Sequence, residues 1–175
     1  MTGPSAAQRA AAVRLLVLDV DGVLTDGRVV YDDQGRELKY FDVRDGHGLK
    51  LLQRAGYQIV WLSGRGSEAN RVRARELGVD HLLEQIKVKL PALTELIQAR
   101  GLTPDQVAFM GDDLIDLPPM RAAGLALCPA DAVPEVLAMA HWVSRHPGGR
   151  GAVREACEFL LKSSGAWDQV TARYF

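Results

Sequence analysis

The segment Leu15–Thr25 constrains this chain most, because four apolar residues there are followed by two aspartates one residue apart. A short apolar run that ends at turn residues is typical of a buried strand. Gly22, directly after Asp21, permits the backbone to turn sharply at that point. An unpaired buried carboxylate is costly, so Asp19 and Asp21 require a cation, hydrogen-bond donors or a shared proton.

Two structural alternatives exist for this acidic pair. Asp19 alone would be satisfied by backbone N–H groups in an Asx turn at the strand end. A calcium loop fits poorly, because Gly22 stands fourth from Asp19 instead of sixth and the twelfth position is Val30 instead of Glu. The Asx turn therefore stays open beside a catalytic or metal-binding pair.

The length and charge of the chain limit its partners. A chain of 175 residues corresponds to one domain, residues 1–175, with a single core. Its 21 Lys and Arg against 22 Asp and Glu give a net charge of −1, so we expect no nucleic acid and no membrane as partner. Cys128 and Cys157 match no metal or redox spacing and are expected to be reduced. No signal-peptide or bilayer-spanning segment is evident, which predicts a cytoplasmic protein.

Apolar runs alternate with helical patterns along the chain. We predict strands near residues 14–20, 58–62, 81–83, 106–110, 125–127 and 141–143. We predict helices near residues 45–55, with Asp45 as N-cap, and near 67–77, 90–100, 117–123, 133–138 and 152–162. Strands that alternate with helices through short loops indicate an α/β fold with a doubly wound, mostly parallel, Rossmann-like sheet.

Three segments lie outside this alternation. Residues 1–12 are expected to form a loose or partly helical N-terminal tail. Residues 28–31 and 36–41 flank Asp32–Gly35, which has turn chemistry, so residues 28–41 predict a hairpin that projects from the core. The C-terminal tail, residues 163–175, carries Trp167, Tyr174 and Phe175 without an evident local core, and we expect it to dock on a neighbouring subunit.

Polar side chains follow several of the predicted strands. Ligands bind at the carboxyl ends of strands in doubly wound sheets. The residues there are Asp19, Asp21, Ser63, Asp112, Asp113 and Asp116, with Lys89 at the start of a helix. Carboxylates and water are the ligands that Mg²⁺ prefers, and a hydroxyl and an ammonium donate to phosphoryl oxygens. The sequence therefore predicts metal-assisted chemistry on a phosphate group.

In their order and spacing these residues resemble the four motifs of the haloacid dehalogenase superfamily of phosphotransferases. Longer runs resemble its 3-deoxy-D-manno-octulosonate 8-phosphate phosphatases, over about Arg14 to Leu161; these runs are Asp21–Gly27, Val43–Gly46, Gly111–Asp116 and Gly148–Glu155. Relatives that act on nine-carbon keto-sugar-acid 9-phosphates, and domains fused to cytidylyltransferases, share much of this pattern. The choice between the two sugar-acid phosphates, and between Mg²⁺ and Mn²⁺, stays open.

The resemblance implies a phosphomonoester hydrolase of lipopolysaccharide precursor synthesis. Asp19 would attack phosphorus and form an aspartyl-phosphate, and Asp21 would be the general acid and then the general base. Mg²⁺ would be held by Asp19, the Asp21 carbonyl and Asp112. Asp113 and Asp116 either support the metal or cap the following helix. Ser63 and Lys89 would hold the transferring oxygens, with Lys87 as a competitor for the lysine role.

The resemblance also implies how substrate is selected. Only 22 residues separate Lys89 from Asp112, which leaves no room there for a cap domain, so a homotetramer is implied in which a neighbouring subunit covers each site. The implied substrate-binding residues are Asp21, Asp42, Val43, Arg44, Asp45, Gly46, Lys50, Gly64, Arg65, Arg73 and Lys89. Arginine suits the carboxylate of a sugar acid, although Arg73 would also serve as a solvated helix residue. Gly148–Gly151 would bind an anion or act as a flexible connection.

Functions from other classes have weaker support. A receiver domain also has a phosphorylated aspartate, but its acidic pair and its phosphoacceptor lie on different strands, whereas Asp19 and Asp21 share one. A non-catalytic phosphoacceptor or scaffold domain would not need every chemical group to be present. A dinucleotide-binding module would need a glycine-rich turn after the first strand, where this chain is acidic.

Overall fold

The computed structural model describes residues 3–175, so Met1 and Thr2 of the expected N-terminal tail lie outside the described residues. Six strands form one sheet in the order β5-β4-β1-β6-β7-β8, and every neighbouring pair is parallel. The strands are β1 Leu15–Leu18, β4 Gln58–Leu62, β5 His81–Leu83, β6 Val107–Met110, β7 Leu125–Cys128 and β8 Trp142–Val143. The predicted doubly wound α/β fold is confirmed.

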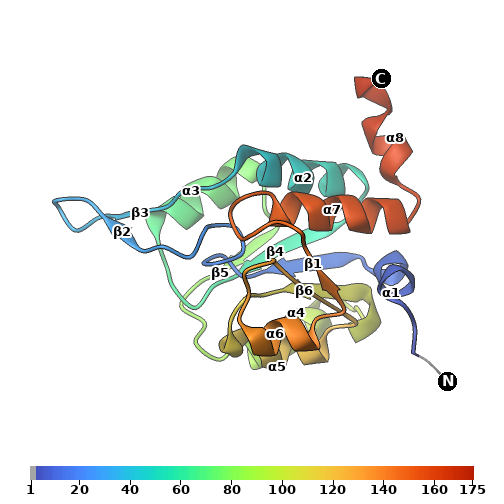
Figure 1. Cartoon of the computed structure of the whole chain (residues 1–175), viewed down its shortest axis with the longest axis horizontal. Coiled ribbons are helices and arrows are strands. Elements are labelled where there is room, and N and C mark those ends of the chain that lie inside the picture. Colours follow the sequence, from blue (N-terminus) through green and yellow to red (C-terminus); the bar gives the residue numbers. More distant parts are fainter. Residues whose placement is uncertain (1–2) are drawn as a thin grey trace.

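Helices cover both faces of the sheet (Figure 1). One layer holds α1 Ala6–Ala12, α2 Val43–Arg54, α3 Glu68–Leu77 and α7 Ala152–Ser163; the other holds α4 Lys89–Ala99, α5 Leu117–Ala122 and α6 Pro134–Met139. In β1, Leu16 and Leu18 belong to the first core and Leu15 and Val17 to the second. All four are fully buried, which explains why this strand is a continuous apolar run instead of an alternating one.

The central strand β1 lies where the chain reverses its direction of travel across the sheet. After β1 the chain builds β4 and β5 on one side, and it then returns to build β6, β7 and β8 on the other. The register pairs Leu18 with Met110, and the backbone N–H of Asp19 donates to the carbonyl oxygen of Met110 at 3.0 Å. The loops after β1 and β6 therefore leave the sheet side by side at the topological switch point, where open α/β sheets bind ligands.

The ends of α3 confirm the sequence-based prediction, whereas the start of α2 corrects it. The side chain of Ser67 caps α3, and Gly78 ends that helix with φ of 62°. The N-cap of α2 is Asp42, not Asp45. Asp45 lies in the first turn of α2, and its buried carboxylate accepts hydrogen bonds from the backbone N–H of Gly151 at 3.3 Å and of Arg154 at 2.7 Å.

Asp45 therefore caps α7, a helix more than 100 residues later in the chain. Gly151 is the N-cap residue of α7, has φ of 105° and carries no side chain that could accept these hydrogen bonds. The prediction for Asp45 was wrong because a local capping pattern carries no information about a distant helix end.

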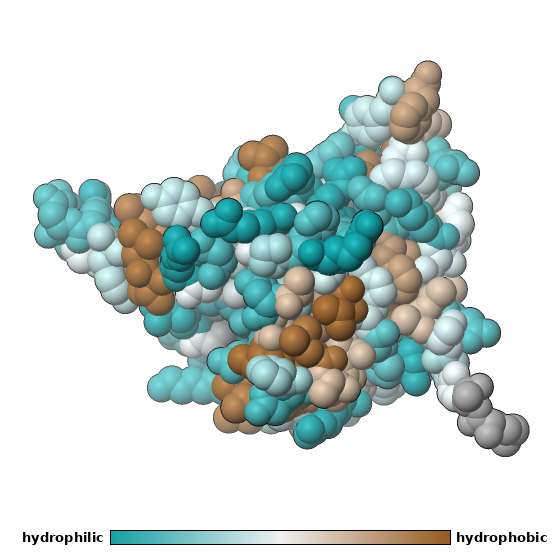
Figure 2. All heavy atoms as spheres, in the orientation of Figure 1, coloured by the Kyte–Doolittle hydropathy of each residue, from teal (hydrophilic) through white to brown (hydrophobic). Residues whose placement is uncertain are grey.

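The expected ribbon is present as a short two-stranded sheet. β2 Val30–Tyr31 pairs antiparallel with β3 Glu37–Leu38, and the N–H of Gly35 closes the turn onto the carbonyl oxygen of Asp32 at 3.0 Å. The ribbon projects from the side of the molecule (Figure 1). Val29 is 50% exposed and Leu38 is 44% exposed, and brown apolar atoms show where the ribbon meets the body (Figure 2).

Both terminal segments make contacts within the chain. Ser5 caps α1, Ala10 and Val13 are fully buried, and the guanidinium of Arg9 donates to the carbonyl oxygen of Gly124 at 2.8 Å. Of the two expected forms, loose or partly helical, the described part of this segment has the helical one. The C-terminal segment forms α8 Trp167–Thr171 and the 3₁₀ turn η3 Ala172–Tyr174. Val170 is buried and Trp167 packs against the core, whereas Tyr174 and Phe175 are exposed. α8 extends away from the end of α7 (Figure 1).

Two further observations concern the cysteines and the bilayer. Cys128 and Cys157 are both buried and free, as expected. Among the helices of residues 3–175, none has the length and apolar character needed to cross a membrane.

Candidate active site

Three aspartates meet at the switch point of the sheet. One carboxylate oxygen from each of Asp19, Asp112 and Asp116 lies within 4.8 Å of the others. Asp19 directly follows β1, and Asp112 follows β6 after Gly111. Asp116 closes the 3₁₀ turn η2 Leu114–Asp116, which brings its side chain back toward the same loop. The two predicted acidic clusters therefore form one group.

Lys89, the first residue of α4, bridges two of these carboxylates. Its Nζ lies 2.9 Å from Oδ1 of Asp19 and 2.6 Å from Oδ1 of Asp116. Lys89 is 1% exposed, and although its burial would lower the pKa, the neighbouring Asp19 and Asp116 carboxylates raise it above the usual value. Lys87, by contrast, is exposed. The lysine in contact with the acidic group is therefore Lys89.

Asp116 and Asp113 have different roles in the loop. Asp116 is fully buried, and its Oδ2 accepts hydrogen bonds from the backbone N–H of Asp112 at 3.1 Å and of Asp113 at 3.3 Å. Asp116 thus holds the loop after β6 as well as Lys89. Asp113 is exposed, and its carboxylate accepts from the N–H of Leu114 at 2.7 Å as the cap of η2. The structure places Asp113 in the capping geometry that the sequence left open.

The acidic group is short of positive charge. Burial, followed by the charges of Asp19 and Asp116, raises the pKa of Asp112 to about 8. Burial and the charge of Asp116 raise the pKa of Asp19 to about 6, although Lys89 acts in the opposite direction. Three ionised carboxylates against one ammonium leave two negative charges uncompensated. A divalent cation would neutralise them.

Two details of the loop fit a bound cation. Among the residues described, Oδ1 of Asp112 is buried and has no hydrogen-bond partner. Gly22 has φ of 93°, and a Cβ at this position would overlap the Asp112 carboxylate. The absence of a side chain at Gly22 therefore lets the loops after β1 and β6 approach each other closely.

A pocket of about 230 Å³ opens beside this group, and we call it the carboxylate pocket; it is lined by Asp19, Asp21, Gly27, Gly64, Arg65, Asp112, Asp113 and Ile115. Ser63 and Lys89 are buried and are not among these lining residues. The hydroxyl oxygen of Ser63 accepts from the backbone N–H of Arg65 at 3.1 Å, which leaves the hydroxyl proton for another acceptor.

The ribbon contributes two residues that the sequence-based analysis missed. The Lys39 ammonium forms an ion pair with Oδ1 of Asp21 and lies 3.7 Å from Oε1 of Glu37. The same Glu37 oxygen lies 3.2 Å from the guanidinium of Arg65. Glu37 and Lys39 are two residues apart, so their side chains lie on the same side of an extended segment. In the sequence, this two-residue spacing is the signal that could have indicated a shared role.

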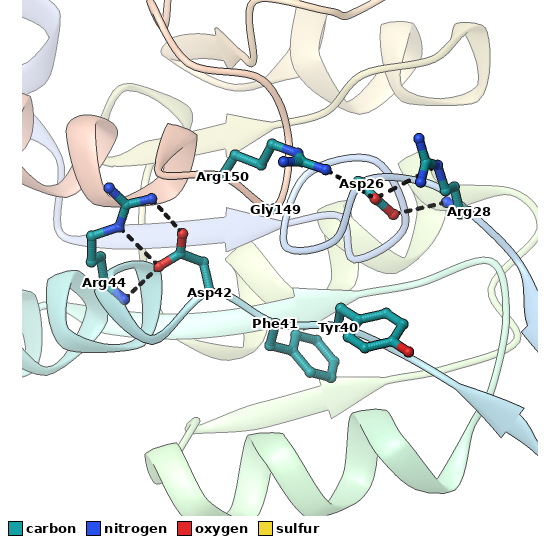
Figure 3. A pocket seen from close by; sticks show the side chains of 8 residues that line it. All are labelled: Asp26, Arg28, Tyr40, Phe41, Asp42, Arg44, Gly149 and Arg150. Atoms are coloured by element: carbon teal, nitrogen blue, oxygen red, sulfur yellow. Dashed lines mark hydrogen bonds and ion pairs between the residues drawn. The ribbon is translucent and has the colours of Figure 1, made fainter.

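A second cavity of about 650 Å³, which we call the arginine pocket, is lined by Asp26, Arg28, Tyr40, Phe41, Asp42, Arg44, Gly149 and Arg150 (Figure 3). Arg44 contacts Asp42 at 2.8 Å, while Arg28 and Arg150 converge on Asp26 at 3.8 Å each. This cavity shares no lining residue with the carboxylate pocket. Within one chain, the predicted substrate residues Asp42 and Arg44 therefore do not line the carboxylate pocket, and Val43 is 78% exposed.

The remaining predicted substrate residues lie between α2 and α3. The ammonium of Lys50 donates to the carbonyl oxygen of Leu77, at the C-terminal end of α3. The guanidinium of Arg73 contacts Glu76 at 2.9 Å and packs so closely over Gly46 that a Cβ there would overlap it. These side chains join two helices in the described structure and do not line the carboxylate pocket.

The glycine-rich segment before α7 serves close packing. The backbone N–H of Gly149 donates to the carbonyl oxygen of Val23 at 3.0 Å, and a Cβ on Gly148 would overlap the carbonyl of Gly22. The anion at the start of α7 is the carboxylate of Asp45. The segment therefore packs against the loop after β1, and the anion that it binds is a carboxylate of the same chain.

Comparison with known proteins agrees with this geometry. Residues 82–155 match the haloacid dehalogenase-like hydrolase family. The 3-deoxy-D-manno-octulosonate 8-phosphate phosphatase of Yersinia pestis is 47% identical over 154 residues, which are 88% of this chain and 82% of that protein.

Solved structures of similar proteins have the same fold. The 3-deoxy-D-manno-octulosonate 8-phosphate phosphatase of Moraxella catarrhalis, in complex with magnesium, phosphate and KDO, matches with a TM-score of 0.95 and 36% identity, covering 97% of this chain and 98% of that one. The cobalt-bound deoxy-D-mannose-octulosonate 8-phosphate phosphatase of Haemophilus influenzae matches with a TM-score of 0.89 and 38% identity, covering 95% and 98%.

Proposed function

This chain belongs to the 3-deoxy-D-manno-octulosonate 8-phosphate phosphatases, within the haloacid dehalogenase-like hydrolases, and on that premise we propose that it hydrolyses the phosphomonoester of this eight-carbon sugar acid. The observation that carries the proposal is the group at the switch point, in which Asp19 contacts Lys89 and faces Asp112 and Asp116. A nucleophilic carboxylate, a buried ammonium and a cation site are the groups that phosphoryl transfer requires.

Magnesium is the cofactor of this activity. Asp19, Asp112 and the main-chain carbonyl of Asp21 would hold the ion, and the unpartnered Oδ1 of Asp112 is the atom that most clearly needs it. Bound there, Mg²⁺ would neutralise the acidic group and stabilise charge on the phosphoryl oxygens. Asp116 would act indirectly, since both of its oxygens already bind Lys89 and backbone N–H groups.

Two aspartates would perform the chemistry. An oxygen of Asp19 forms a bond to phosphorus while the bond from phosphorus to the sugar oxygen breaks, and Asp21 gives its proton to that leaving oxygen. Asp21 then removes a proton from water, whose oxygen attacks the aspartyl-phosphate, so that phosphate leaves and the Asp19 carboxylate is restored. The acid is required because an alkoxide is a poor leaving group and the uncatalysed hydrolysis is extremely slow.

Ser63 and Lys89 would bind the transferring oxygens. The Ser63 hydroxyl accepts a hydrogen bond from the backbone N–H of Arg65. Its own proton is not used in that hydrogen bond and can be donated to a phosphoryl oxygen. The Lys89 ammonium would offset the repulsion between the Asp19 carboxylate and the incoming phosphate. Arg65 and Gly64, which line the carboxylate pocket, would contact the substrate beyond the phosphate.

The division of the predicted substrate residues between two pockets supports a role for a neighbouring subunit. We propose a cytoplasmic homotetramer of lipopolysaccharide precursor synthesis, in which the segment Asp42–Gly46 and its arginine pocket face the site of another copy. The ribbon exposes the apolar residues Val29 and Leu38, which supports an interface between subunits at the ribbon. A monomeric variant that keeps full substrate selectivity would contradict this arrangement.

Phosphate release across a panel of eight- and nine-carbon keto-sugar-acid phosphates, with and without chelator, tests the function. We expect the highest kcat/KM with the eight-carbon 8-phosphate, loss of activity with chelator, and recovery with Mg²⁺. A preference for a nine-carbon 9-phosphate would replace the substrate but keep the chemistry. Stable phosphorylation without turnover would favour a phosphoacceptor domain instead.

A further inference from the structure

A chain of ionic contacts connects the ribbon with both sides of the carboxylate pocket. It runs from Asp21 through Lys39 and Glu37 to Arg65. Asp21 belongs to the loop after β1 and Arg65 to the loop after β4, and both line the pocket. The two intermediate residues come from the segment at β3 that returns from the ribbon tip. We call these four residues the ion-pair chain.

Lys39 is the most buried member of the ion-pair chain. Its side chain is 1% exposed, against 22% for that of Asp21 and 45% for that of Arg65. A lysine head group is normally kept in water, so its burial here requires the two carboxylates that face it. Because this ammonium does not line the pocket, it is not placed to touch a substrate.

Lys39 contacts only one oxygen of Asp21. In residues 3–175, the one side chain that hydrogen-bonds the Asp21 carboxylate is that of Lys39, and it binds Oδ1. Oδ1 can accept this hydrogen bond both when a proton is carried on Oδ2 and when the group is ionised, although the ionised form binds the ammonium more strongly. The contact can therefore persist while Asp21 changes from acid to base.

We propose that Lys39 is a positioning residue for the reaction, which holds Oδ1 of Asp21 so that Oδ2 is directed at the leaving oxygen and then at water. Glu37 positions Arg65 in the same way, through its contacts with that guanidinium and with Lys39. The ribbon thereby positions both the general acid, Asp21, and the substrate-binding residue Arg65. This inference rests on the role of Asp21 in the proposed function.

The test compares two phosphate esters in single-turnover experiments with the full-length chain and Mg²⁺. An alkyl phosphate needs a proton on its leaving oxygen, whereas 2,4-dinitrophenyl phosphate does not. We expect Lys39→Met to slow phosphoryl transfer from the alkyl ester by about 30-fold or more, since a general acid contributes about 10²–10⁴-fold. The burst of dinitrophenolate should change by less than about twofold.

A double-mutant cycle separates positioning from a general structural effect. Lys39→Met should cost little further activity toward the alkyl ester in an Asp21→Asn background, because residues that act as a unit are non-additive. Arg36→Met is the matched control, since Arg36 lies on the same ribbon, is exposed, and pairs with Asp32 at the tip. Equal losses with both esters, or full additivity with Asp21→Asn, would overturn the proposal.

Two further comparisons keep the outcome decisive. If Lys39→Met does not fold, Lys39→Arg is used instead, because it retains the charge but displaces the donor. We expect a smaller loss that is confined to the alkyl ester. An unchanged ratio of the rates with the alkyl ester and with 2,4-dinitrophenyl phosphate would refute the positioning role. If the wild type ignores sugar-acid phosphates but cleaves another alkyl phosphate, the substrate assignment fails while the Lys39 test remains valid on that ester.

Discussion

Gly22 and the carboxylate of Asp112 approach so closely that a Cβ on Gly22 would overlap that carboxylate. Gly22 also has φ of 93°, which residues with a side chain rarely adopt. Two loops from adjacent strands thus share a space that only a glycine leaves free, and the cation site depends on it.

Gly22→Ala should therefore weaken metal binding. We expect the Mg²⁺ affinity to fall by at least about tenfold, a loss typical of disturbed metal-site supports, with a parallel loss of kcat. Calorimetric titration with Mg²⁺ measures this directly. Gly56→Ala is the control, because Gly56 has φ of 85° but a Cβ there would meet no atom of residues 3–175 within 4 Å beyond its chain neighbours, and so it reports backbone strain alone. Equal Mg²⁺ affinity in the two variants would argue against the packing explanation.

Asp19→Asn should abolish turnover and retain the fold. The amide cannot attack phosphorus, and the change removes one of three crowded carboxylates, so the melting temperature should not fall appreciably. Circular dichroism and phosphate release provide the two measurements. Substantial residual phosphatase activity would refute Asp19 as the nucleophile.

Asp21→Asn should separate the two half-reactions. With a good leaving group Asp19 can still be phosphorylated, but the water that cleaves the intermediate has lost its base, so a phosphorylated enzyme should accumulate. Intact-protein mass spectrometry after rapid quenching detects the adduct. If none forms with any ester, Asp21 is not the acid and base.

Lys89→Met should destabilise the protein severely. The change leaves Asp19 and Asp116 buried without their ammonium, and breaking a buried ion pair in this way costs about 3–5 kcal/mol. Urea unfolding of the metal-free protein measures the loss. Lys87→Met, at an exposed position two residues away, should stay within about 0.5 kcal/mol of the wild type. Similar values for both variants would contradict the assignment.

Asp45 should make stability depend on pH. Burial raises the pKa of Asp45 to about 6 from the ordinary 3.8, although the N–H groups of Arg154 and Gly151 act against this shift. Between these two values the folded protein binds the proton more tightly than the unfolded chain does, so stability should fall as pH rises through the window and then level off. The full difference is about 3 kcal/mol at most.

The variant Asp45→Asn should lack this part of the pH dependence. Unfolding free energies of wild type and variant, measured at intervals from about pH 4 to about pH 7, give the difference that isolates Asp45 from other titrating groups. Asp33→Asn, at an exposed position of the ribbon turn, serves as the control. Parallel curves for wild type and Asp45→Asn would show that Asp45 does not titrate in this range.

The sequence by itself determined the sheet and the groups at its edge. The apolar run of β1 and the strand Gln58–Leu62 needed no distant information, because strand and helix periods are local properties. Since parallel strands end at a common edge, Asp19 and Asp112 were also predictable as neighbours.

Only the tertiary structure decided what each charged side chain contacts. Asp45 caps a helix that begins 106 residues later in the chain. Lys39 contacts Asp21, although the sequence pattern predicts that its hairpin projects from the core. The resemblance favoured Lys89 over Lys87, but only the fold shows that Lys89 is buried against the aspartates while Lys87, two positions earlier, is exposed. The physical reason is that charge pairing and burial depend on groups brought together by the whole fold, whereas a sequence pattern reports only the period of its own segment.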